Sequence, residues 1–206
     1  DYNKYTTIYK FKINDDGSLK YNNKTKEEGS TINQFSLDEY QNNLRVALSG
    51  NEGSRIVIFD ENLKKIGSTE YLSKGERMYS TRFLGNKAYM VTYKNTDPLY
   101  AIDLSIPTSP KVLGELKIPG YSTYLHPYDE NHLIGIGMET KEKVYRDSFG
   151  KVKRTTAIIT GMKMALFDVS DINNPIQISK TVIGDSRTTS AILTNHKALL
   201  FSKEKG

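Results

Sequence analysis

The sequence predicts an all-β fold, a β-propeller made of four-stranded blades, and three observations lead to this prediction. A short apolar segment that ends in Asp recurs at Ile56–Asp60, then 43 residues later at Leu99–Asp103, and again 65 residues after that at Met164–Asp168. Each repeat holds four short segments rich in Tyr, Phe, Ile, Val and Thr that alternate with a period of two. No window long enough for a helix shows helical periodicity. A repeat of about 43 residues with four strands is typical of a propeller blade.

The blades follow one another along the chain. We assign 6–26 to the last two strands of a preceding blade, 31–72, 77–118 and 120–183 to three complete blades, and 188–202 to the first hairpin of a following blade. This makes about four blade equivalents, with an incomplete blade at each end. We therefore expect a fragment of a longer propeller whose ring is not closed. Open blade edges expose unpaired strands, so the fragment is expected to self-associate.

The third blade is longer because it carries an insertion, residues 140–159, between its second and third strands. Good strand formers flank the insertion, and Asp147–Gly150 has the composition of a turn. We expect an extended, positively charged β-hairpin that stands off the propeller and is either decorative, or contacts an anionic partner, or covers the channel mouth. Its basic residues are Lys141, Lys143, Arg146, Lys151, Lys153 and Arg154.

Composition excludes several classes of protein. The 206 residues include 29 Lys and Arg, 24 Asp and Glu and no Cys, and the net charge is +5. Without Cys there are no disulfides, thiolate metal sites or Cys nucleophiles. No apolar stretch approaches the length of a transmembrane helix, and any signal peptide lies outside this sequence. No module specific for nucleic acid is present, so no specific nucleic-acid partner is predicted.

A set of longer motifs resembles a known family. Over 6–202 the chain resembles secreted bacterial and archaeal proteins with a C-terminal β-propeller domain distantly related to WD-40 repeats. The resemblance implies the propeller fold and a secreted or cell-surface location, and it implies no catalytic residues. The motifs that carry it are Asn33–Tyr40, Leu44–Ala47, Gly75–Ser80, Asp97–Leu99, Leu113–Gly120, Ser122–Pro127 and Leu166–Ser170.

The first strand of each blade is expected to line the central channel, so residues at equivalent positions face a shared space. Ser occupies the first set of equivalent positions, and the side chains two residues later in each strand point to the same face. They could form a polar rim that binds a ligand, or the small Ser residues could serve packing and bond to neighbouring backbone, with Asp38 and Arg82 pairing across adjacent blades. The candidate channel-lining residues are Ser36, Asp38, Ser80, Arg82, Ser122, Tyr124 and His126.

Two other sets of polar residues have structural interpretations. The Asp that ends each third strand is expected to form an Asx turn; the three are Asp60, Asp103 and Asp168. His132 and His196 fall in turns that lead to the second strands of consecutive repeats, which lie far apart in a propeller, so we do not expect them to share a metal.

These observations lead to a non-catalytic extracellular binding or scaffold domain with an unidentified protein or surface-polymer partner and no cofactor. No Gly-x-Ser-x-Gly elbow, Gly-x-Gly-x-x-Gly loop or Walker loop is present. The alternative is a channel-centred, metal-dependent hydrolase of the lactonase type, so enzyme activity stays open. That enzyme would use His126 together with carboxylates such as Asp38, Glu39, Glu76 and Asp97. Metal content of the purified protein would separate the two hypotheses.

Overall fold

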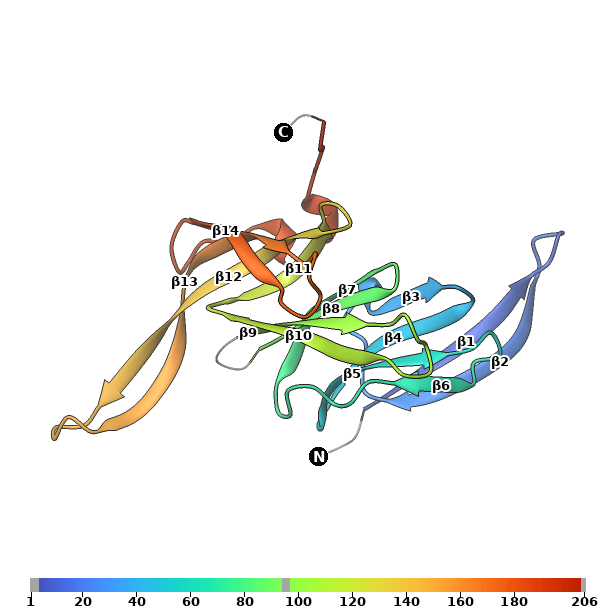
Figure 1. Cartoon of the computed structure of the whole chain (residues 1–206), viewed down its shortest axis with the longest axis horizontal. Helices are drawn as coiled ribbons and strands as arrows, with labels where there is room; N and C mark the ends of the chain where they lie inside the picture. Colours follow the sequence, from blue (N-terminus) through green and yellow to red (C-terminus); the bar gives the residue numbers. More distant parts are fainter. Residues whose placement is uncertain (1–3, 94–96, 205–206) are drawn as a thin grey trace.

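The computed structural model describes residues 4–93 and 97–204, which form β-strands and short 3-10 helices (Figure 1). Every sheet is antiparallel, and its strands pair in chain order. A two-stranded sheet contains β1 (Tyr5–Ile13) and β2 (Leu19–Glu28). The first four-stranded sheet contains β3 (Leu37–Tyr40), β4 (Asn43–Gly50), β5 (Gly53–Phe59) and β6 (Lys65–Ser68). The second contains β7 (Arg77–Leu84), β8 (Lys87–Tyr93), β9 (Asp97–Asp103) and β10 (Lys111–Ile118). The third contains β11 (Tyr121–Pro127), β12 (His132–Arg146), β13 (Val152–Asp168) and β14 (Ile176–Ile183).

Consecutive sheets stack face to face, and the period-two alternation supplies both faces of each inner sheet. In β8, Ala88 and Met90 pack against the first four-stranded sheet, whereas Tyr89 and Val91 pack against the third. The strands β5 and β8 are therefore apolar on both sides, as strands covered on two faces must be. Four-stranded antiparallel sheets stacked in this way are propeller blades, so the predicted fold class is confirmed.

A turn of each following blade packs closely against a glycine in the fourth strand of the blade before it. A Cβ atom on Gly114 of β10 would lie 2.3 Å from the carbonyl oxygen of Ile172, and one on Gly67 of β6 would lie 2.1 Å from that of Pro107. Both oxygens belong to the Pro-containing turns that follow the third strand of a blade. The same close approach thus recurs at both junctions between four-stranded sheets.

The turns after the third strands are closed by Asp side chains, as the sequence predicts. The carboxylates of Asp60, Asp103 and Asp168 accept backbone N–H groups two residues further along, at 2.8–2.9 Å. The hydroxyl of Ser170, and after it the backbone N–H of Ser170, hold the pKa of the Asp168 carboxyl below its ordinary value. The repeated Asp is therefore a turn former.

The first strands of neighbouring blades lie next to one another, as β7 and β11 do, so they form the inner edge of the stack. Ser80 and Ser122 lie in these strands, but Ser36 does not. It ends the 3-10 helix η1 (Gln34–Ser36), which forms because the side chain of Asn33 accepts the backbone N–H of Phe35 at 3.0 Å. The expectation of three serines on inner strands is thus wrong for Ser36, because local capping starts β3 one residue later.

The last segment does not form the expected hairpin over 188–202. It contains two 3-10 helices, η2 (Ala191–Leu193) and η3 (His196–Ala198), and no strand in its described part. Asn195 caps η3 through the backbone N–H of Lys197 at 3.1 Å. A two-stranded hairpin is marginal without further strands to pair with, so local turn chemistry decides the conformation here.

The insertion, residues 140–159, continues β12 and β13 as an antiparallel hairpin that projects from the body of the molecule (Figure 1). The pairing runs from Thr140 opposite Ile159 to Arg146 opposite Val152. The turn that connects the strands is closed by Asp147 and by Gly150, whose φ of 78° few other residues adopt. Among the described residues, no helix is long and apolar enough to cross a membrane.

Candidate ligand-binding site

Four of the inner-edge residues meet where the three blades approach one another. Phe35 comes from η1, Arg82 from β7, and Tyr124 and His126 from β11. All four side chains are half-buried. We call these residues the Arg82 cluster.

The guanidinium of Arg82 packs on two aromatic rings that also contact each other, with centroids 5.6 Å apart. Its Cζ atom lies 3.8 Å from the centroid of Phe35 and 5.3 Å from that of Tyr124. Its Nε atom donates a 2.8 Å hydrogen bond to the carbonyl oxygen of Leu125, which fixes the plane of the group. Stacking on an aromatic face is favourable for a guanidinium, and more so when water is excluded.

Arg82 lacks a negative partner within the described residues. Its Nη2 atom is buried without a hydrogen-bond partner there, and the ion pairs of this part of the chain do not include it. Burial lowers the pKa of Arg82 from its ordinary value, while Tyr124 opposes that shift. Because arginine stays protonated in proteins, the cluster carries an uncompensated positive charge.

His126 extends the cluster along β11. Its Nδ1 atom lies 3.2 Å from the hydroxyl of Tyr124, so one group donates to the other. Burial lowers the pKa of His126, and the charge of Arg82 lowers it further. The imidazole is therefore neutral at neutral pH and can donate or accept a hydrogen bond without adding charge.

Two further side chains, His196 and Gln34, lie at the border of the cluster. His196 packs its ring against Phe35 at 4.8 Å, and Gln34 Nε2 lies 2.9 Å from His196 Nε2. Phe35 itself was not among the predicted site residues, although an aromatic residue precedes Ser at all three equivalent positions (Phe35, Tyr79 and Tyr121). The recurring aromatic residue before Ser was the available signal, but the contact between Phe35 and Arg82 joins two different blades.

The other inner-edge candidates are engaged elsewhere. Ser80 donates to the carbonyl oxygen of Ser122 at 2.7 Å, and Ser36 accepts the backbone N–H of Ile32 at 3.1 Å. All three serines are buried, so their hydroxyls serve the packing of the inner edge.

Asp38 does not pair with Arg82, contrary to the pairing considered from the sequence. It forms an ion pair with the buried Arg45 of its own blade, which also donates to the carbonyl oxygen of Gly85 at 2.6 Å. Asp38 and Arg45 face each other directly in the register of β3 and β4, so the pair forms within one hairpin. This contact leaves Arg82 without Asp38.

The residues named for a metal-dependent enzyme are dispersed. Glu76 accepts the hydroxyl of Thr92 at 2.6 Å, Asp38 pairs with Arg45, and Glu39 is exposed on β3. The side chain of Asp97 lies outside the described residues. Within the described residues, no group of three or more His, Asp and Glu side chains is placed to hold a metal ion.

A groove of about 470 Å³ lies between β1 and the first four-stranded sheet. Tyr9, Lys10 and Phe11 form one wall, and Glu39 and Asp60 belong to the other. Asp60 is occupied by its turn. The groove thus offers no convergent set of polar groups comparable with the Arg82 cluster.

Comparison with known sequences agrees with the architecture. Residues 1–206 match a family described as "Beta propeller domain". An uncharacterized protein of Methanocaldococcus jannaschii is 46% identical over 162 residues, covering 75% of this chain and 23% of that protein. An uncharacterized protein of Archaeoglobus fulgidus is 37% identical over 179 residues, covering 86% of this chain and 26% of that protein. The chain thus spans about a quarter of the length of these relatives.

Proposed function

Because the chain belongs to the β-propeller domain family, we propose that it is a non-catalytic binding domain whose inner edge recognises an anionic ligand through the Arg82 cluster. The observation that carries this proposal is the guanidinium of Arg82, which packs on the rings of Phe35 and Tyr124 and has no carboxylate partner in the described part of the chain. A partly buried cation is costly unless a negative group compensates it. A bound anion would supply that charge.

The surrounding side chains favour a small carboxylate or phosphate. Beyond the Nε–H that the carbonyl of Leu125 accepts, the guanidinium of Arg82 retains N–H donors, among them those of the buried Nη2, and carboxylate or phosphate oxygens accept such donors. Tyr124 and the neutral ring of His126 together add one donor on the same strand, because one of the two groups donates to the other. The ring of Phe35 covers part of the guanidinium.

The same geometry supports binding over catalysis. The acidic residues considered for a hydrolase are separated from the cluster, since Asp38 pairs with Arg45 and Glu76 bonds to Thr92. The cluster therefore has a cation and hydrogen-bond donors but no neighbouring carboxylate to act as a general base. The metal-dependent hydrolase remains the second hypothesis, and the metal content of the purified protein tests it.

We further propose that the domain acts at the cell surface or in a secreted protein. The support is the resemblance of motifs such as Asn33–Tyr40 and Ser122–Pro127 to secreted bacterial and archaeal propellers related to WD-40 repeats. In that location the partner of the domain would be another protein or a surface polymer.

Calorimetric titration of the purified chain with citrate and with inorganic phosphate tests the ligand class. We expect the chain to bind one of these anions and the Arg82→Met variant to lose about tenfold or more in affinity, because charge-assisted hydrogen bonds are lost. Arg77→Met is the matched control, since Arg77 begins the same strand and is exposed.

The Arg77→Met variant should bind like the parent. Equal affinity of parent and Arg82→Met would contradict the proposal, provided that both unfold at the same temperature. Absence of binding to either anion by the parent chain would contradict it as well.

A further inference from the structure

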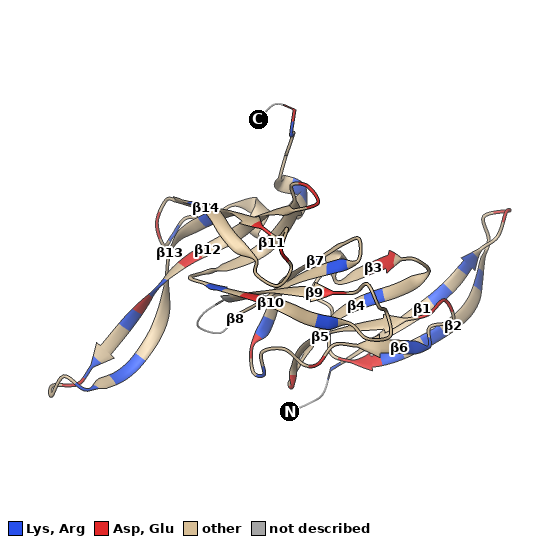
Figure 2. Ribbon diagram, viewed as in Figure 1, with Lys and Arg blue, Asp and Glu red and all other residues tan. Residues whose placement is uncertain are grey.

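A second surface, separate from the Arg82 cluster, is formed by the projecting hairpin of residues 140–159, which we call the hairpin arm. The described side chains of residues 141–144 and 146–155 are all exposed. Figures 1 and 2 show the arm extending beyond the three four-stranded sheets, with basic residues along both of its strands. The proposed binding function does not use this arm.

The turn at the end of the arm presents a large apolar ring to solvent. The side chain of Phe149 is 94% exposed. The turn is rigidly closed beneath it, because the carboxylate of Asp147 accepts the backbone N–H groups of Phe149 at 2.9 Å and of Lys151 at 3.0 Å. Arg146 adds a 2.9 Å hydrogen bond to the carbonyl oxygen of Gly150. The closed turn thus leaves the side chain of Phe149 open to solvent at the end of the arm.

Cations surround this ring. Arg146 precedes the turn, and Lys151, Lys153 and Arg154 follow it. Between Lys143 and Thr160 the sequence contains one acidic residue, Asp147, and its carboxylate is engaged by the backbone of the turn. The end of the arm therefore combines an exposed apolar tip with a net positive charge.

The strand register gives the arm two different faces. Val144 and Val152 lie on one face, where they are 44% and 49% exposed. On the other face the ring of Tyr145 lies between Lys143 and Arg154, at 5.1 Å and 4.8 Å. Val144 and Val152 thus flank Arg146 on one face, while on the other face the ring of Tyr145 contacts Lys143 and Arg154.

We propose that the hairpin arm docks the protein on an anionic lipid surface. Phe149, together with Val144 and Val152, enters the interfacial layer, and the cations beside the tip contact the phosphates of the headgroups. An apolar tip ringed by Lys and Arg is the arrangement that favours such an interface, because each cation is attracted by the surface and the apolar side chains leave water.

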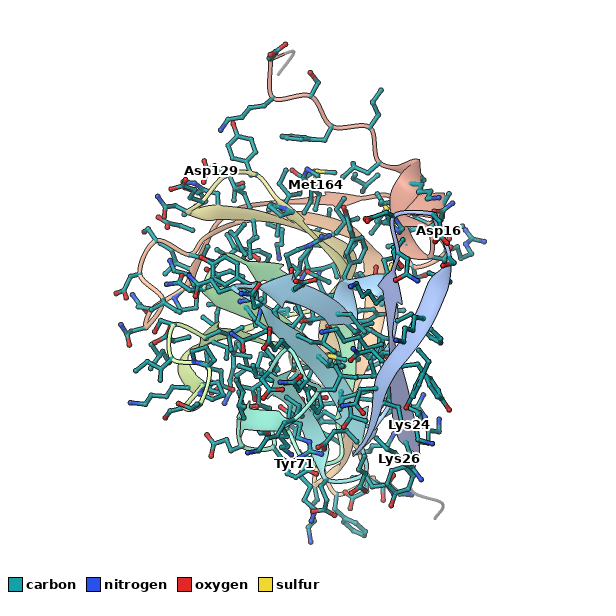
Figure 3. The ribbon with its side chains drawn as sticks, turned by 90° about the vertical axis from the view of Figure 1, so that its right-hand side faces the viewer. Asp16, Lys24, Lys26, Tyr71, Asp129 and Met164 are labelled. Atoms are coloured by element: carbon teal, nitrogen blue, oxygen red, sulfur yellow. The ribbon has the colours of Figure 1, made fainter. Side chains whose placement is uncertain are left out.

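The apolar tip distinguishes a lipid surface from an acidic polymer or protein. A polyanion would bind the Lys and Arg side chains, and the ring of Phe149 beyond them would add little to its affinity. The other projecting hairpin of this chain provides a contrast, since its turn contains the acidic pair Asp15 and Asp16 (Figure 3 labels Asp16). The basic, apolar-tipped turn is therefore specific to the hairpin arm.

Co-sedimentation with vesicles tests the proposal. We expect the chain to bind vesicles of phosphatidylcholine with phosphatidylglycerol at near-physiological salt, and not vesicles of phosphatidylcholine alone. Phe149→Ser should reduce the partition coefficient by about tenfold, since the burial of one aromatic side chain is lost. A double change of Lys151 and Lys153 to Ser should reduce it to a similar extent and weaken its dependence on salt.

Matched controls come from the N-terminal hairpin. Ile13→Ser removes an apolar side chain that is 73% exposed, and a double change of Lys12 and Lys20 to Ser removes two cations that face each other across that hairpin. These variants should bind vesicles like the parent. Two outcomes overturn the proposal: no binding of the parent chain to the anionic vesicles, or binding that Phe149→Ser leaves unchanged. In the second case retained binding of heparin or polyglutamate would identify a polyanion surface instead.

Discussion

The hydroxyl of Ser80 donates a 2.7 Å hydrogen bond to the backbone carbonyl of Ser122, and so joins the inner strands of two blades. Both residues are 2% exposed. The bond lies beside the start of a bulge in each strand, where the ladder between the first and second strands is interrupted. The hydroxyl of Ser80 thus provides a hydrogen-bond partner for the carbonyl of Ser122, which is buried between the two blades.

Replacement of Ser80 by Ala should destabilise the chain by about 1–2 kcal/mol, because the carbonyl of Ser122 loses a partner in a buried place. Urea denaturation measures the change. Ser148→Ala, in the exposed turn of the hairpin arm, is the control and should have no effect. An unfolding midpoint for Ser80→Ala equal to that of the parent would show that this hydrogen bond contributes nothing.

Gly114 should not tolerate a side chain. In Gly114→Ala the new Cβ would lie 2.3 Å from the carbonyl oxygen of Ile172 in the adjoining blade, so the two sheets must separate. We expect a loss of about 2–3 kcal/mol in the free energy of unfolding. Gly50→Ala is the control, since its nearest contact would be an ordinary 3.6 Å, and it should cost less than about 1 kcal/mol. If both variants unfolded alike, Gly114 would not set the spacing between blades.

The architecture could be predicted from the sequence because every blade repeats the same pattern at nearly the same interval. The conformation around residue 195 could not, because the first hairpin of a blade needs further strands beside it, and no local signal reports their presence. For the site, Arg82, Tyr124 and His126 followed from their places in the inner strands. The contact between Arg82 and Phe35 joins two blades, so no spacing in the sequence could indicate it.

The pKa of His126 gives a testable pH dependence. Burial and the charge of Arg82 lower it below the ordinary value of 6.5. The unfolded chain therefore binds this proton more readily than the folded chain. The contribution of His126 to stability is complete above the unfolded pKa and is lost as the pH falls through 6.5 toward the lowered value.

An NMR titration of the three His side chains checks this shift. We expect His126 to titrate below 6.5 and to move upward in Arg82→Met, since one of the two causes is then removed. His132, whose Nδ1 lies 2.8 Å from a carboxylate oxygen of Asp129, serves as the reference ring in the parent and the variant. A pKa of His126 at or above 6.5 would be inconsistent with a partly buried ring beside a cation.

The third sheet should promote self-association of this chain. Ala165 and Phe167 are buried against the second sheet, whereas Met164, on the opposite face, is 38% exposed. Figure 3 shows Met164 on the side of this sheet that faces away from the other blades. In the first and second four-stranded sheets both faces are covered, so this open face is the place where another sheet would pack.

Light scattering over a range of concentrations measures the association. We expect the mass to rise with concentration, and Met164→Lys to suppress the rise by placing a charge on the open face. Thr155→Lys, on the exposed hairpin arm, adds the same charge elsewhere and should leave the association unchanged. A chain that stays monomeric at all concentrations would contradict this prediction.

The most direct test of the central claim is an NMR titration of the chain with citrate and then with inorganic phosphate, at a pH where all three His side chains are neutral. Anion binding at the Arg82 cluster predicts that the ring signals of Tyr124 and His126 shift in a saturable manner, that those of His132 do not, and that Arg82→Met abolishes the shifts. It would be contradicted if neither anion moved the signals of Tyr124 and His126, or if Arg82→Met shifted them as the parent does.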